Sequence, residues 1–228
     1  EFWQYRPLAD GESAARVDWR RSARSDDLFV REREREDRAT LHLWVDEAPT
    51  MDFASNGGRT KREYASLLCA ALAVSVIDAG ELVVLKAQGI IRDGLDLLRP
   101  AKPGRDVPAS RGDVAIIASD WLADDTKSTL RRLSDLGVTG VALVVADPAE
   151  CDYTLTGTVS VDALNGTSEP RRLDKAEAVS DQYFRAWCAH LHAVEEAARG
   201  VGWGFLFLRT DAAPADSVAS LAAMIGRQ

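Results

Sequence analysis

From residue 39 onward, short apolar runs of strand length alternate with longer stretches in which apolar residues recur at helical spacing. The runs that predict buried strands are residues 40–45, 81–87, 113–119, 141–146 and 205–208. The stretches that predict helices are residues 60–78, 123–136, 174–200 and 214–225. Because buried strands that alternate with helices form parallel sheets, we expect an α/β fold with a mostly parallel sheet and helices on both faces.

Residues 1–38 have a different pattern, dense in charge and in turn-forming residues. Phe2, Trp3 and Tyr5 alternate with polar positions, and Leu28-Phe29-Val30 resembles the start of a second strand. We therefore expect two parts, a short strand-rich segment over 1–38 that packs on an α/β domain over 39–228. The chain begins with Glu1 and not with Met, so we also expect that a longer parent was trimmed.

The charged run from Arg31 to Arg38 leaves two interpretations open. As a strand, it would place arginines on one face and glutamates on the other, and as a helix it would form i,i+3 ion pairs. The run is either a solvated, salt-bridged stretch or a docking surface.

Composition excludes several classes of function. The chain of 228 residues carries a net charge of −8, which opposes binding to nucleic acid or to an anionic membrane surface. No apolar run reaches the roughly 18 residues that a membrane span needs. The three cysteines, Cys69, Cys151 and Cys188, form no CxxC pair, as expected of packing residues in a reducing, cytoplasmic compartment. The sequence has neither a phosphate-binding glycine motif nor a GxSxG nucleophile motif.

Acidic residues stand where the predicted strands end. Asp46, Asp120 and Asp147 each follow a strand directly, and Asp211 lies close behind another. In open α/β sheets, ligands bind beyond the carboxyl ends of the strands. Carboxylates there could hold Mg²⁺, with Thr50 as a nearby hydroxyl ligand, or they could cap the helices and loops that follow.

Trp19, Arg20, Arg21 and Arg24 form a basic, aromatic cluster in the N-terminal segment. The cluster could grip the carboxylates of a partner or a phosphate. Alternatively, Trp19 anchors the segment on the domain while the arginines pair with neighbouring glutamates.

Several of these runs together resemble the domain of unknown function 58 family. The runs are Tyr5-Arg6-Pro7, Val17-Asp18-Trp19-Arg20, Leu28 to Glu32, Asp46 to Phe53, Thr60-Lys61-Arg62-Glu63, Ser119-Asp120-Trp121-Leu122 and Arg209-Thr210-Asp211. The resemblance implies a bacterial protein with a von Willebrand factor A-like fold. It also implies a role as an adaptor or co-chaperone of a MoxR-type AAA+ ATPase that acts on an unknown client protein.

The same resemblance implies a degenerate metal-ion-dependent adhesion site. Such sites use D-x-S-x-S with a distant Thr and Asp. Here Asp46 and Thr50 stand at the first and last positions of the motif, Ala48 replaces its first serine, and Asp120 corresponds to the distant Asp. We expect no cofactor, or weakly bound Mg²⁺ on Asp46, Thr50 and Asp120.

The function that we expect is a non-enzymatic protein-interaction module. Its expected binding surface comprises Asp46, Thr50, Met51, Phe53, Asp120 and Trp121 at the strand ends, with exposed Trp121 and Phe53 as the apolar anchor, together with Trp19, Arg20 and Arg24. One alternative is a metal-dependent hydrolase that uses Asp46, Asp120 and Asp147. The other is a structural subunit whose edge strand near 153–164 pairs with a partner.

Overall fold

The computed structural model describes most of the chain in two compact units, which divide between Arg38 and Ala39. The described residues are 3–7, 19–23, 28–33, 39–55, 57–86, 88–94, 96, 108–123, 126–162 and 170–226. The predicted packing of the first unit on the second stays a prediction. Among the described residues, no helix combines the length and the apolar character that a membrane span requires.

The N-terminal unit is a two-stranded antiparallel sheet with one short helix. It comprises β1 (Trp3–Pro7), α1 (Trp19–Ser22) and β2 (Phe29–Arg33). Tyr5 pairs with Arg31 in the sheet, and the backbone N–H of Phe29 donates to Oγ of Ser22 at 2.9 Å. The two predicted strands are present, but most of the charged run, residues 34–38, lies outside the described residues.

The second unit is built on a six-stranded sheet in the order β10-β7-β6-β3-β4-β5. Its strands are β3 (Thr40–Val45), β4 (Leu82–Leu85), β5 (Gly89–Ile91), β6 (Val114–Ser119), β7 (Thr139–Ala146) and β10 (Gly204–Arg209). All neighbours are parallel except β4 and β5, which are antiparallel. The predicted α/β architecture with a mostly parallel sheet is confirmed.

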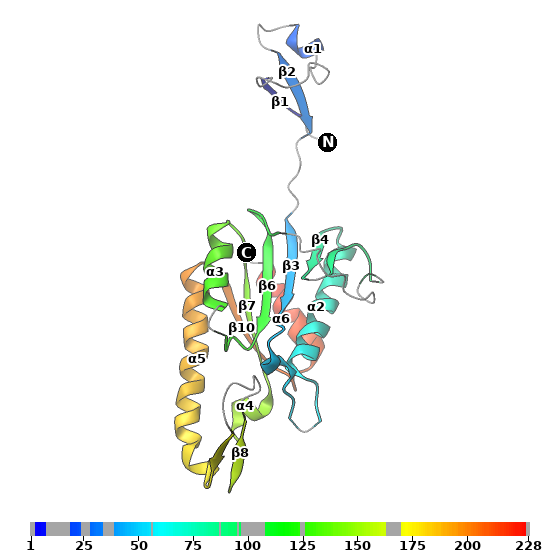
Figure 1. Ribbon diagram of the computed structural model, residues 1–228. Helices are drawn as coiled ribbons and strands as arrows, with labels where there is room; N and C mark the ends of the chain where they lie inside the picture. Colours follow the sequence, from blue (N-terminus) through cyan, green and yellow to red (C-terminus); the bar gives the residue numbers. More distant parts are fainter. Residues whose placement is uncertain are drawn as a thin grey trace. The chain divides into compact units, whose positions relative to one another are not determined.

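Two helices cover each face of this sheet (Figure 1). The helices α2 (Lys61–Asp78) and α6 (Pro214–Ile225) pack on one face, and α3 (Thr126–Asp135) and α5 (Ser180–Gly200) pack on the other. Tyr64 and Leu68 of α2 and Leu221 of α6 are fully buried in the first core layer, while Leu130 of α3 and Val194 of α5 lie in the second. The helical spacing of the apolar residues therefore marks the faces that meet the sheet.

Short elements lie beyond the carboxyl edge of the sheet (Figure 1). They are the 3-10 helix η2 (Pro49–Asp52), helix α4 (Pro148–Asp152), the antiparallel pair β8 (Val159–Val161) and β9 (Arg171–Leu173), and the 3-10 helix η4 (Ala176–Val179). The predicted strand over 153–164 is reduced to β8, and the predicted helix over 174–200 becomes η4 followed by α5. A Ramachandran angle φ of 40° at Tyr153 ends α4 and reverses the chain before β8.

The three cysteines have different environments. Cys69 is fully buried, and this burial raises the pKa of its thiol to about 12, as expected of a packing residue. Cys188, in contrast, is exposed, so the expectation that all three cysteines serve in packing is wrong for this residue.

Candidate functional site

The parallel strands bring the predicted acidic residues to one edge of the sheet. Asp46 follows β3, Asp120 follows β6 and Asp147 follows β7. The backbone continues the sheet here, because the N–H of Asp46 still donates to the carbonyl of Ala118 at 2.9 Å. Asp120 and Asp147 are each only 1% exposed, so their carboxylates must be compensated inside the protein.

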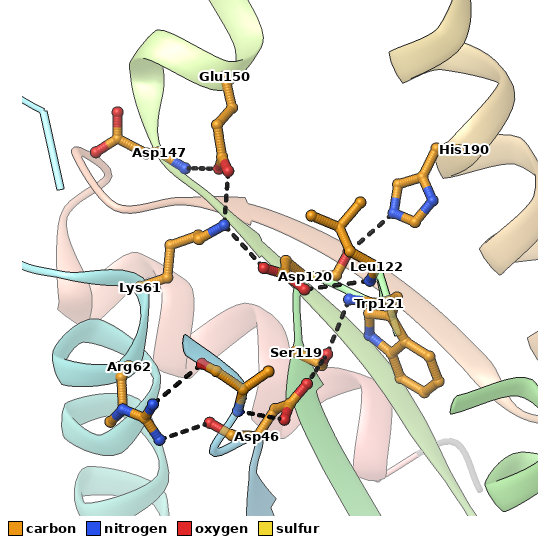
Figure 2. Close-up of polar contacts among 11 residues, drawn as sticks. Asp46, Lys61, Arg62, Ser119, Asp120, Trp121, Leu122, Asp147, Glu150 and His190 are labelled. Atoms are coloured by element: carbon orange, nitrogen blue, oxygen red, sulfur yellow. Dashed lines mark hydrogen bonds and ion pairs between the residues drawn. The ribbon is translucent and has the colours of Figure 1, made fainter. Parts of the chain in front are cut away.

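The compensating charge for Asp120 is the ammonium group of Lys61, the first residue of α2 (Figure 2). This lysine is completely buried. Its Nζ donates to Oδ2 of Asp120 at 2.9 Å and to Oε1 of Glu150 at 2.6 Å. One cation therefore joins the start of α2, the end of β6 and helix α4.

The second oxygen of each of these carboxylates is also occupied. Oδ1 of Asp120 accepts the backbone N–H of Leu122 at 3.1 Å, and Oε2 of Glu150 accepts that of Asp147 at 2.8 Å. A buried ion pair stabilises a fold only when such additional hydrogen bonds satisfy its remaining polar atoms. The network of Lys61, Asp120 and Glu150, which we call the Lys61 network, meets this condition.

Asp147 organises the loops on either side of it. Its Oδ1 accepts the N–H of Ala149 at 2.8 Å, and its Oδ2 accepts that of Ser55, far away in sequence, at 2.9 Å. Together with Glu150 it forms a capping box at the start of α4. The capping alternative of the sequence analysis thus describes Asp147.

Both carboxylate oxygens of Asp46 accept hydrogen bonds from groups at the same edge of the sheet. Its Oδ1 accepts the N–H of Ala48 at 2.8 Å, and its Oδ2 accepts the hydroxyl of Ser119 at 2.6 Å. The same Ser119 Oγ accepts the N–H of Trp121 at 2.8 Å (Figure 2). Asp46 therefore couples the loop after β3 to the loop after β6.

Arg62, in the first turn of α2, also stabilises the loop after β3. Its guanidinium group donates to the carbonyl groups of Asp46, Glu47 and Ala48, each at 3.1 Å. It also donates from Nε and Nη2 to the two carboxylate oxygens of Asp52, at 2.6 and 3.0 Å. This hydrogen bonding lowers the pKa of Asp52.

The residues at this edge do not fit the metal set that the sequence analysis predicted. Both carboxylate oxygens of Asp46 bind hydrogen-bond donors, and the ammonium of Lys61 lies against Asp120. Thr50 lies in η2. Nowhere among the described ranges do three or more His, Cys, Asp or Glu side chains gather as a metal ion would need. A divalent cation beside Asp120 would face the positive charge of Lys61 at close range.

Three of the predicted surface residues, Met51, Asp120 and Trp121, are buried. Trp121 is 4% exposed and Met51 is fully buried. The expectation of an exposed Trp121 is wrong because its backbone takes a φ of 60°, and its indole Nε1 donates to the carbonyl of Leu143 at 3.1 Å. The side chain that points outward here is the next one, Leu122, which is 50% exposed, while Phe53 is half-buried.

A histidine supports the turn at Trp121 from the neighbouring helix. Nε2 of His190, in α5, lies 2.8 Å from the carbonyl oxygen of Asp120 (Figure 2). A carbonyl only accepts hydrogen bonds, so Nε2 of His190 carries the proton. His190 is thus a tether between α5 and the end of β6.

Sequence reasoning missed the role of Lys61, although a signal for it exists. Lys61 lies three and four residues before the buried Tyr64 and Ala65, on the apolar face of α2. A cation in the first turn of a helix is also disfavoured by the helix dipole. A lysine on the apolar face and in the first turn of a helix is unfavourable for both reasons. Its presence there indicates that buried carboxylates neutralise its charge.

The predicted N-terminal cluster is only partly described. Trp19 is 63% exposed. The side chain of Arg20 and the whole of Arg24 lie outside the described residues. Whether this cluster takes part in binding stays a prediction.

Comparisons with known proteins give one solved structure and one family model that are similar to this chain. Its structure is similar to the crystal structure of the conserved hypothetical protein BatB from Bacteroides thetaiotaomicron, with a TM-score of 0.43 and 13% sequence identity over 83% of this chain and 98% of that chain. We draw no functional conclusion from this weak likeness. No curated protein matches the sequence. The model of the family described as "Protein of unknown function DUF58" matches residues 4–108 of this chain.

Proposed function

We propose that the protein is a non-enzymatic interaction module with a von Willebrand factor A-like fold, which binds a MoxR-type AAA+ ATPase as an adaptor in protein complex assembly. The match of residues 4–108 to the DUF58 family model and the mostly parallel, helix-covered sheet support this proposal. The hydrolase and structural-subunit alternatives stay predictions.

One observation carries the proposal. At the carboxyl edge of the sheet, where α/β proteins place their ligands, the described polar side chains hold the protein's own loops in place. Asp46, Lys61, Arg62 and Asp147 each bind two or more groups of this chain. This arrangement favours a rigid rim of loops, as a docking surface needs, over a set of groups free to react with a substrate.

The rim presents an exposed apolar side chain, and acidic side chains are exposed at the same edge of the sheet. Leu122 is 50% exposed, its own backbone N–H donates to Asp120, and the N–H of the preceding Trp121 donates to Ser119. Exposed Glu47 and Asp52 belong to the loop after β3 at the same edge. An exposed apolar side chain on a pre-ordered backbone is a suitable anchor for a protein partner. We propose Leu122 for the role that the sequence analysis gave to Trp121.

The proposal is tested by direct binding. A MoxR-type ATPase would be purified, and its affinity for the chain measured by biolayer interferometry with and without Mg-ATP. We expect Leu122→Asp to weaken binding at least tenfold, about 1.4 kcal/mol, because a carboxylate would be buried at the contact.

Leu136→Asp is the matched control. Leu136 is 52% exposed, and it follows α3 just before the amino end of β7, away from the rim. Its variant should bind like the wild type. Binding that is absent in the wild type, or equal loss in both variants, would contradict the proposal.

A further inference from the structure

Lys61 makes contacts that resemble those of a small oxygen-bound cation. Its ammonium binds one oxygen from each of two carboxylates, at 2.9 Å to Asp120 and at 2.6 Å to Glu150. The side chains of Lys61 and Asp120 are each 1% exposed and that of Glu150 is 18% exposed. One of the two carboxylate charges is thus neutralised here by a group of the protein itself.

We infer that the ammonium of Lys61 takes the place of a divalent metal ion at the carboxyl edge of the sheet. The edge is therefore organised without metal, although carboxylates end its neighbouring strands. Lys61 provides what a bound metal ion would provide: it draws carboxylates from separate elements to one point and neutralises part of their charge.

The neighbouring groups leave no set of ligands for a second cation. Mg²⁺ requires near-octahedral oxygen ligands at short range, usually with several waters. The carboxylate oxygens of Asp120 and Glu150 that do not contact Lys61 each accept a backbone N–H group. Both carboxylate oxygens of Asp147 also accept backbone N–H groups. A metal ion would have to displace both these donors and the lysine.

Removal of the lysine should therefore create a metal site. In Lys61→Ala, the carboxylates of Asp120 and Glu150 would lose their common counter-ion and would face the space left by the lysine side chain. Two nearby carboxylates without a counter-ion attract a divalent cation. Alanine is also well tolerated near the start of a helix, so the backbone of α2 should persist.

The experiment measures metal binding directly. Mn²⁺ would be titrated into the purified chain and followed by electron paramagnetic resonance, and the melting temperature would be measured in EDTA and in millimolar Mg²⁺. We expect the wild type to show no saturable Mn²⁺ binding and the same melting temperature in both solutions. Lys61→Ala should bind Mn²⁺ at least tenfold more tightly than the wild type and should melt at a higher temperature with Mg²⁺ than with EDTA.

Two further variants test the assignment. Adding Asp120→Asn to Lys61→Ala should remove the gained Mn²⁺ binding. The control is Lys86→Ala, which removes an exposed lysine next to the ring of Trp44 and should bind Mn²⁺ no better than the wild type. Saturable Mn²⁺ binding by the wild type that Asp120→Asn abolishes would overturn the inference. So would a folded Lys61→Ala variant that binds no metal. If Lys61→Ala does not fold, Mn²⁺ titration of the wild type and of its Asp120→Asn variant still shows whether this edge binds a metal ion. None of these outcomes depends on the proposed ATPase partner.

Discussion

The two ends of the central sheet each hold a buried contact between a basic and an acidic side chain, but the two contacts are built in opposite ways. At the carboxyl end, Lys61 binds two carboxylates, and each carboxylate gains a backbone N–H. At the amino end, Nε2 of His42 lies 3.1 Å from Oδ2 of Asp113. His42 is 1% exposed and Asp113 is 9% exposed, so burial alone does not distinguish the pairs.

The two contacts differ in whether the acidic or the basic side chain makes the additional hydrogen bonds to neighbouring elements. Asp113 accepts the backbone N–H of Thr40 at 3.0 Å and that of Ser110 at 2.7 Å, and so ties the starts of β3 and β6 together. Nδ1 of His42 finds no hydrogen-bond partner among the described residues. The acid is thus the central group at the amino end, whereas the cation is central at the carboxyl end. A buried contact between a basic and an acidic side chain can therefore be organised by either of its members.

The largest expected effect is the loss of Lys61. Lys61→Met keeps most of the side-chain volume but leaves Asp120 and Glu150 without their cation, which should lower the free energy of unfolding by about 3–5 kcal/mol. Urea denaturation followed by circular dichroism would measure this change. Glu150→Gln should cost less than Asp120→Asn, because the Glu150 side chain is 18% exposed and that of Asp120 1%.

The control for this comparison is Lys86→Met, which removes an exposed lysine whose Nζ lies 5.8 Å from the centre of the Trp44 ring. It should change the stability by less than about 1 kcal/mol. A Lys61→Met variant as stable as this control would contradict the central role of the cation.

An intermediate effect is expected at the amino end. Asp113→Ala should cost about 2 kcal/mol, since it leaves the N–H groups of Thr40 and Ser110 without their acceptor. His42→Leu should cost less, because it removes a ring nitrogen that already lacks a partner among the described residues. The same urea denaturation ranks the two variants, and the reverse order would show that the histidine organises this end.

The smallest effect concerns an ion pair at the carboxyl end that is exposed. Arg209 donates to the carboxylates of Asp152 and Asp211, at 2.9 to 3.0 Å, and its hydrogen bonds lower the pKa of Asp211. Arg209→Ala should change the stability by less than about 1 kcal/mol, because side chains about half exposed are screened by water.

Arg209→Ala should nevertheless change the pKa of Asp211. With a lowered pKa in the folded state, Asp211 contributes stability above its unfolded pKa of about 3.9 and loses it as the pH falls through the folded value. In Arg209→Ala the pKa of Asp211 should rise toward its ordinary value, as observed by NMR of the carboxyl carbon. An unchanged pKa would mean that Arg209 does not act on this carboxylate.

Local pattern was sufficient for most elements of the fold. The expected strand over 40–45 and the expected helix over 214–225 agree with β3 and α6 in both bounds. The capping box of Thr60 and Glu63 is present at the start of α2. Such elements are predictable because apolar periodicity and capping depend on residues that are close in sequence. The three-residue strand β5 and the five-residue helix α4 were missed, since neither is long enough to show a period.

The sequence by itself thus determined the class of fold, the order of its main elements and the edge at which the acidic residues gather. Only the tertiary structure decided what those residues do there. The partner of Asp120 is Lys61, 59 positions away, and the indole of Trp121 turns inward to a carbonyl of the neighbouring strand while Leu122 faces outward. Pairing across such separations depends on how helices and strands pack, and one backbone angle at Trp121 decides which side chain is exposed.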